Sequence, residues 1–265
     1  MNRNRLLALV TANKDRAKRH EILNADGKEA TVYLYDLIDA DYGISPEAFV
    51  KAFNAITAPT IHLRINSPGG DAFGGRAMAT AISQHKSNVI AHVDGLAASA
   101  ASYVAIAADS VEMAPGSFMM IHKAFTLAFG NADDLLSTAA LLEKVDASLA
   151  ADYAKKTGKP QSQIAEWMSA ETWFTAEESV DQGFANSVAK TEAEGVENAW
   201  DLSVYDHAPK KEPKKLALTA DESAQLVTIT AKEIEALAAE AAANEQASLD
   251  HADRVRRFGL LTATA

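Results

Sequence analysis

Hydrophobic and polar positions along the first two thirds of the chain follow two patterns. Short β-rich apolar segments predict strands at residues 31–37, 60–66, 89–93, 110–113 and 119–122. Longer segments with apolar residues at three- and four-residue steps predict helices at 46–56, 75–85, 97–108, 132–156, 160–168 and 176–183. Strands that alternate with helices imply parallel pairing, so the chain should form a layered α/β domain.

The same pattern indicates where this domain begins and ends. We expect a basic N-terminal segment at 1–24, the α/β domain at 25–190, a linker at 191–219 and a helical extension at 220–265. The linker prediction rests on the Pro/Lys-rich stretch 208–215, which has little apolar content. The extension is rich in Ala and Glu, and it is either a surface or oligomer-packing helix or a partner-binding segment.

Composition narrows the classes of function. The 265 residues are 48% hydrophobic and 23% charged, which is enough apolar material for a real core. The chain has no cysteine, which excludes disulfides, thiolate nucleophiles and cysteine-based zinc sites. A net charge of -11 argues against a general nucleic-acid binder. The sequence contains no zinc-protease, P-loop or dinucleotide-binding motif.

The sequence gives little support for membrane insertion or export. No run approaches the roughly 18 to 20 apolar residues that span a bilayer. The short run 6–12 follows Arg3 and Arg5 and has about the minimum length of a signal-peptide core, but polar residues interrupt it at once. The absence of cysteine also gives no support for an oxidising compartment. We therefore expect a cytoplasmic protein with no membrane partner.

Three local motifs contain the groups that acyl transfer requires, namely a nucleophile, a base and N–H donors for an oxyanion. The stretch 66–70 (NSPGG) ends a predicted strand with two glycines that leave backbone N–H groups unobstructed. The stretch 95–102 (GLAASAAS) places Ser99 among small residues at the start of a helix. His122 ends a short apolar strand. Taken alone, Ser99 could equally be a helix cap, and Ser102 an alternative nucleophile.

Together and in this order, the motifs resemble those of serine peptidases related to the proteolytic subunit of the Clp protease. That group includes the prophage-encoded, ClpP-like head maturation proteases. The resemblance covers about residues 31–188 and implies the layered fold that Clp proteolytic subunits share with crotonases. It assigns the nucleophile to Ser99 and the general base to His122, and it places Gly69, Gly70 and Ala100 around the oxyanion hole.

The third member of the triad departs from the usual family pattern, which has an aspartate at this place. The stretch 171–178 (ETWFTAEE) stands there instead, so Glu171 is the expected acid. Asp181 or a neighbouring carboxylate is the alternative, and a Ser-His pair without an acid is another. The implied mechanism proceeds through an acyl-enzyme and uses no metal and no other cofactor.

The resemblance also implies partners. Helix 132–156 looks like the handle through which two rings of subunits meet, so we expect a homo-oligomeric ring or stacked rings acting on a protein or peptide substrate. An AAA+ unfoldase or a phage capsid protein would be the further partner.

Other functions remain open from the sequence. A crotonase-like acyl-CoA enzyme would use the same oxyanion amides without a covalent serine, and a signal-peptide-peptidase relative would use a lysine base. A phage assembly or scaffold protein would act chiefly by binding capsid subunits, with little catalysis.

Overall fold

The computed structural model describes residues 5–13, 22–25, 27–190 and 200–209. The chain divides into two compact units, Met1–Pro209 and Lys210–Ala265. All the described residues belong to the first unit. The predicted helical extension at 220–265, residues 191–199 and 210–219 of the predicted linker, and residues 1–4 and 14–21 of the predicted N-terminal segment lie outside the described residues.

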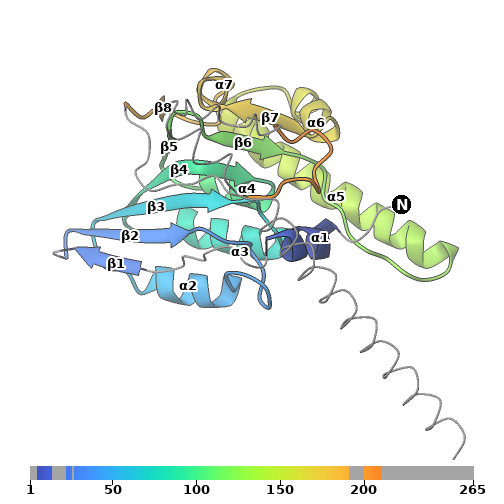
Figure 1. Ribbon diagram of the computed structural model, residues 1–265, viewed down its shortest axis with the longest axis horizontal. Helices are drawn as coiled ribbons and strands as arrows, with labels where there is room; N and C mark the ends of the chain where they lie inside the picture. Colours follow the sequence, from blue (N-terminus) through green and yellow to red (C-terminus); the bar gives the residue numbers. More distant parts are fainter. Residues whose placement is uncertain (1–4, 14–21, 26, 191–199, 210–265) are drawn as a thin grey trace, which may run out of the picture. The chain divides into compact units, whose positions relative to one another are not determined.

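One mixed sheet organises the first unit (Figure 1). Its strands are β1 (Ile22–Ala25), β2 (Glu29–Leu34), β3 (Thr60–Ser67), β4 (Asn88–Ala98), β5 (Ser110–Met113), β6 (Phe118–Ile121), β7 (Thr172–Thr175) and β8 (Ser187–Val188). The order is β1-β2-β3-β4-β5-β8. Strand β6 pairs with the C-terminal end of β4 and with β7. All pairs are parallel except β1 with β2 and β6 with β7. The predicted layered α/β fold is confirmed.

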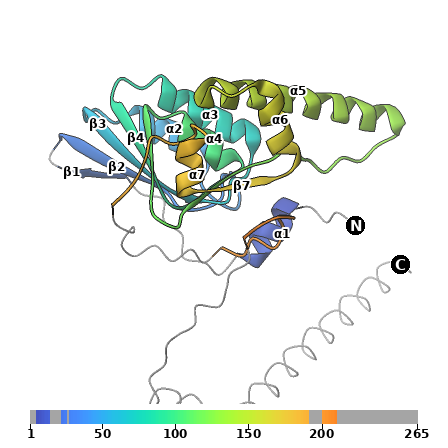
Figure 2. The same ribbon diagram turned by 90° about the horizontal axis from the view of Figure 1, so that it is seen from above.

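The central strands alternate buried and half-exposed side chains, so one face of the sheet is apolar and helices pack against it. In β3, Ile61, Leu63 and Ile65 are fully buried and belong to the main core. The helices are α1 (Arg5–Ala12), α2 (Pro46–Asn54), α3 (Ala72–Ser83), α4 (Ala100–Ile106), α5 (Ala132–Thr157), α6 (Gln161–Ser169) and α7 (Ala176–Asp181). Figure 2 shows α2, α3 and α5 on one side of the sheet and α1 on the other.

The longest predicted helix is confirmed as α5. A capping box at Asn131 begins it, and Gly158, with φ of 71°, ends it in the left-handed conformation. Only Ala150 and Tyr153 of its side chains are buried, both near the C-terminal end. The N-terminal half of α5 therefore projects from the sheet and its covering helices (Figure 1).

Strand β4 differs from its prediction in a way that matters for the site. The sequence predicted a strand at 89–93 and a helix from 97, whereas β4 continues to Ala98 and the helix begins at Ala100. Ala97 and Ala98 pair with Met119 and Met120 of β6 and are fully buried. Burial within the ladder overrides the helical preference of alanine here, so Ser99 stands at the junction of strand and helix.

Among the described residues, no helix is long and apolar enough to cross a membrane. The same residues contain no group of three or more His, Asp or Glu side chains arranged to hold a metal ion.

Candidate active site

Ser99 occupies the tight junction between β4 and α4. Its backbone has φ of 54° and ψ of -124°, a conformation that costs energy for any residue with a side chain. Its N–H donates to the carbonyl of Met120 at 2.9 Å, which ties the junction to β6. The hydroxyl does not cap α4. It lies 2.8 Å from Nε2 of His122 instead, so the junction aims the serine away from its own helix.

His122 follows directly after β6 and presents its ring to Ser99. The residue is only 9% exposed, and its ring packs against Phe125 and Tyr205 with centroid distances of 5.6 and 5.7 Å. A separation of 2.8 Å between Nε2 and Oγ is within the range of about 2.6 to 3.2 Å needed for proton transfer. The structure thus brings the sequence-predicted nucleophile and base together.

Ser102, the alternative serine, points elsewhere. It is fully buried, and its hydroxyl donates to the carbonyl of Ser99 at 2.7 Å. The same hydroxyl pairs with the phenol of Tyr153 on α5 at 2.8 Å. Both contacts hold it in the core between α4 and α5, and it does not line the cavity at Ser99.

Glu171 immediately precedes β7, and His122 immediately follows β6. The antiparallel ladder between these strands ends at the pair Ile121–Thr172, so both residues adjoin the same end of the ladder. Glu171 is 7% exposed and adopts a positive φ of 49°. Its Oε1 accepts a hydrogen bond from the backbone N–H of His207 at 2.7 Å. By contrast, Asp181 is exposed at the end of α7.

The glycine pair fits against two backbone segments that leave no room for side chains. A Cβ at Gly70 would lie 2.1 Å from the carbonyl oxygen of Ile38, and one at Gly69 would lie 2.9 Å from the amide nitrogen of Ala100. Both glycines also have positive φ, 93° at Gly69 and 147° at Gly70. The N–H groups of Gly70 and Ala100 donate no hydrogen bond within the described residues. Backbone N–H groups are the type of donor that an oxyanion hole uses.

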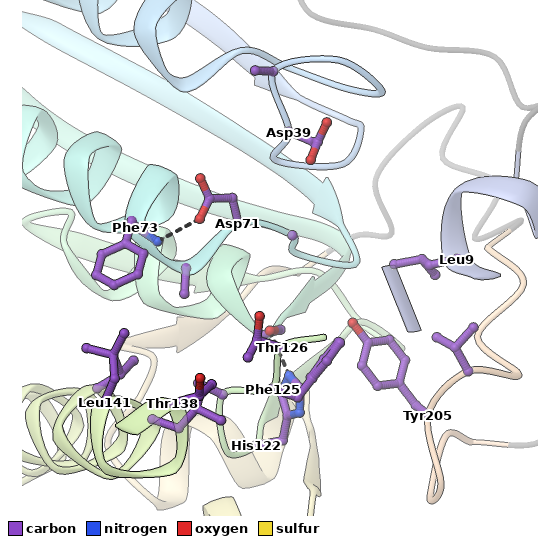
Figure 3. A pocket seen from close by; sticks show the side chains of 18 of the residues that line it. Leu9, Asp39, Asp71, Phe73, His122, Phe125, Thr126, Thr138, Leu141 and Tyr205 are labelled. Carbon is purple, nitrogen blue, oxygen red and sulfur yellow. Dashed lines mark hydrogen bonds between the residues drawn. The ribbon is translucent and has the colours of Figure 1, made fainter. Parts of the chain in front are cut away.

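A cavity of about 410 Å³ opens at the Ser99 hydroxyl. Ser99, His122 and Gly70 form its reactive part, and the rest is mainly apolar. Those apolar residues are Leu9, Phe73, Phe125, Leu141, Leu142, Val145, Val204 and Tyr205, seen in part in Figure 3. The cavity can take an apolar side chain beside a carbonyl group placed at Ser99.

Sequence reasoning missed the residues that the segment 200–209 contributes to this site. Val204 and Tyr205 line the cavity, although they fall inside the predicted linker. The signal was the alternation of Trp200, Leu202 and Val204 with polar residues, which is unusual for a solvated linker.

Comparison with known proteins decides the family. The family model described as Clp protease matches residues 20–192, more than half of the chain. The chain belongs to the Clp protease family. Its resemblance to this family, seen first in three short motifs, is thereby confirmed.

Individual relatives are Clp proteolytic subunits. Subunit 2 of the ATP-dependent Clp protease from Treponema denticola is 33% identical over 132 residues, which cover 49% of this chain and 66% of that protein. Subunit 2 from Tropheryma whipplei is 28% identical over 164 residues, 61% of this chain and 91% of the relative. The match therefore spans about two thirds of the Treponema denticola subunit's length.

A solved structure shows the same fold. The chain matches a mutant of ClpP1 from Listeria monocytogenes with a TM-score of 0.54 and 23% sequence identity, covering 60% of this chain and 90% of that one. At this level of identity, the likeness establishes the Clp protease fold alone.

Proposed function

We propose that this Clp protease family member is a serine endopeptidase that cleaves peptide bonds through a Ser99-His122-Glu171 triad. The observation that carries the proposal is the 2.8 Å contact between the Ser99 hydroxyl and His122 at the mouth of an apolar cavity. Family membership supports peptidase chemistry, and the strained conformation of Ser99 is typical of a functional position.

The reaction begins when His122 Nε2 takes the proton of the Ser99 hydroxyl as its oxygen attacks the peptide carbonyl carbon. The carbonyl oxygen becomes an oxyanion and accepts the N–H groups of Gly70 and Ala100, while Gly69 keeps the strand end close to the nucleophile. Glu171 orients the imidazole and stabilises its protonated form.

Breakdown of this intermediate breaks the C–N bond, and His122 donates its proton to the departing amine. A water molecule then attacks the acyl-enzyme with His122 again as base, which releases the acid product and restores Ser99. The apolar cavity lined by Phe73 and Leu142 binds the substrate side chain next to the cleaved bond. Every step uses groups of this chain, the substrate and one water molecule.

The proposal extends to assembly and partners. The projecting half of α5 exposes Leu135, Leu136 and Leu141, which are 47%, 68% and 52% exposed. Such a surface suits packing against a second copy, so we propose a cytoplasmic homo-oligomer in which α5 joins stacked rings around the active sites. An AAA+ unfoldase would then deliver the substrate. Alternatively, a phage capsid protein would itself be the substrate, as in head maturation.

Trapping the nucleophile tests the proposed function. We expect a fluorophosphonate to add one adduct to the wild-type chain by intact-mass analysis, mapped to Ser99 by peptide sequencing. Ser99→Ala should take no adduct, whereas Ser102→Ala should still react at Ser99. Labelling that persists in Ser99→Ala, or a folded wild type that takes no adduct, would contradict the proposal.

The same variant separates catalysis from a scaffold role. A protease loses cleavage of its target with Ser99→Ala, whereas a scaffold protein keeps capsid association and assembly. A crotonase-like acyl-CoA enzyme needs no covalent serine, so it would retain thioester chemistry in that variant.

A further inference from the structure

The segment 200–209 lies across the candidate active site although it falls beyond the family match at 20–192. Figure 2 shows this segment beside α1, on the side of the sheet opposite α2 and α3. Two hydrogen bonds between Asn13 and the backbone of Asp201, at 2.8 and 3.0 Å, join it to the end of α1. Trp200 and Tyr205 are 6% and 7% exposed and pack on Leu96, Ala98 and Met120.

This segment holds the end of β3, where the glycine pair begins. The phenol of Tyr205 donates to the carbonyl oxygen of Pro68 at 2.7 Å. The indole N–H of Trp200 donates to Oδ1 of Asn66 at 3.2 Å. Pro68 immediately precedes Gly69, so its carbonyl and the Gly69 N–H belong to the same peptide group, the first of the glycine pair.

The same tyrosine also contacts the histidine. Its ring stands edge-on to His122 with a centroid distance of 5.7 Å and an interplanar angle of 86°. The ring also contacts that of Trp173 in β7, again with a centroid distance of 5.7 Å. One residue therefore touches both the strand end that precedes the oxyanion donors and the proposed base, and Figure 3 shows it reaching into the cavity.

We propose that Tyr205 is a positioning residue of this active site. Its hydroxyl fixes the Pro68–Gly69 peptide, from which the backbone turns through Gly69 to the Gly70 N–H, while its ring limits the rotation of His122. The inference deepens the proposed function and rests on it. Glycines with positive φ have wide conformational freedom, so their N–H groups stay within the narrow distance that oxyanion binding demands only if the peptides around them are fixed. Ile38 binds the Gly69 carbonyl and the Asp71 N–H, and Tyr205 adds a bond to the peptide before Gly69.

Tyr205→Phe tests this role because it removes the hydroxyl and keeps the ring that lines the cavity. We expect the limiting rate of Ser99 labelling by a fluorophosphonate to fall about tenfold, with the half-saturating concentration of the reagent almost unchanged. The rate of cleavage of a short blocked peptide ending in a leucine coumarin amide should fall in kcat, with little change in KM.

Tyr103→Phe is the matched control. It also removes a phenol that donates at 2.7 Å, in this case to Asp152, and Tyr103 does not line the cavity. We expect its labelling rate to equal that of the wild type. An equal rate in Tyr205→Phe, or a change in KM alone, would overturn the positioning role, because Tyr205 would then be packing or binding only.

A second measurement does not depend on catalysis. Hydrogen exchange of a peptide covering 66–72, followed by mass spectrometry, should be faster in Tyr205→Phe than in the wild type and unchanged in Tyr103→Phe. A wild type that takes no fluorophosphonate overturns the proposed function, but exchange still reports whether Tyr205 fixes the strand end. Unchanged exchange with normal labelling overturns the inference and leaves the proposed function standing.

Discussion

At the scale of single residues, the site depends on backbone conformations that ordinary residues avoid. Ser99 and Glu171 are the non-glycine residues with positive φ among the described residues, at 54° and 49°. Both belong to the proposed triad, and both lie at a junction held by the β6 ladder. Strain concentrated at these two positions is typical of functional residues that the surrounding fold holds in place.

The identity of the acid can be tested directly. We expect Glu171→Gln to lower kcat by about 10² to 10⁴-fold, because an amide cannot stabilise a protonated histidine as a carboxylate does. Asp181→Asn, at the exposed end of α7, should leave kcat within about twofold of the wild type. Peptidase assays on both variants check this. A larger loss in Asp181→Asn than in Glu171→Gln would move the acid to Asp181.

Asp146 of α5 gives a pH-dependent prediction. Its Oδ1 accepts the N–H of Ala124, two residues after His122, at 2.7 Å. Burial raises the pKa of the Asp146 carboxyl, although this hydrogen bond and the nearby Lys123 both act to lower it. A folded-state pKa above the unfolded value favours folding at low pH, and that advantage is lost as the pH rises through the folded-state pKa.

Asp146→Asn keeps an acceptor for Ala124 without the charge. We therefore expect its Tm to rise relative to the wild type as the pH goes from about 4 to 7, in the range where a raised carboxyl pKa titrates. Thermal unfolding at several pH values measures the difference in Tm between Asp146→Asn and the wild type. A difference that stays constant with pH, or one in which the wild-type Tm rises relative to that of the variant, would contradict the prediction.

At the scale of elements, the end of β3 and the start of α3 form one backbone arrangement. Gly69 accepts from the Ile38 N–H at 2.9 Å, and Asp71 donates to the Ile38 carbonyl at 2.7 Å, so the glycine pair is held on both sides. Asp71 also begins α3 by accepting the N–H of Phe73. The strand end, the helix start and the oxyanion donors therefore depend on the same few hydrogen bonds.

Gly70→Ala should disrupt this arrangement. The new Cβ would lie 2.1 Å from the Ile38 carbonyl oxygen, so the strand end must shift. We expect kcat to fall about 100-fold or more, comparable to removing an oxyanion donor. Gly116→Ala is the control, because Gly116 also has a positive φ, 75°, but open space around it. Its kcat should match the wild type, and equal losses in both variants would argue for a general folding effect.

At the scale of the whole molecule, the proposed assembly depends on the exposed part of α5. Leu136→Glu places a charge on its most exposed leucine, which is 68% exposed. We expect this variant to sediment as a smaller species than the wild type, because a buried unpaired carboxylate destabilises an interface. Ser137→Glu is matched in charge and neighbouring in sequence, and should sediment as the wild type. Identical sedimentation of all three would remove α5 as the contact.

The sequence by itself determined the family and the layered α/β class, and it singled out Ser99 and His122 as the proposed nucleophile and base. This was possible because Ser99, His122 and the glycine pair stand in short contiguous motifs, and the residue types in each motif indicate its chemical role. Helix α5 was predictable because its apolar period is long and its ends are marked by Asn131 and Gly158.

Tertiary structure decided the rest. The extent of β4 to Ala98 followed from pairing with β6, and β7 formed because Trp173 and Phe174 found partners in Met120 and Met119. Tyr205 reached the site through contacts between distant segments, including a hydrogen bond to the carbonyl of Pro68, 137 residues earlier in the chain. Local patterns contain no information about contacts over such separations, since burial and pairing between distant segments are set only when the chain is folded.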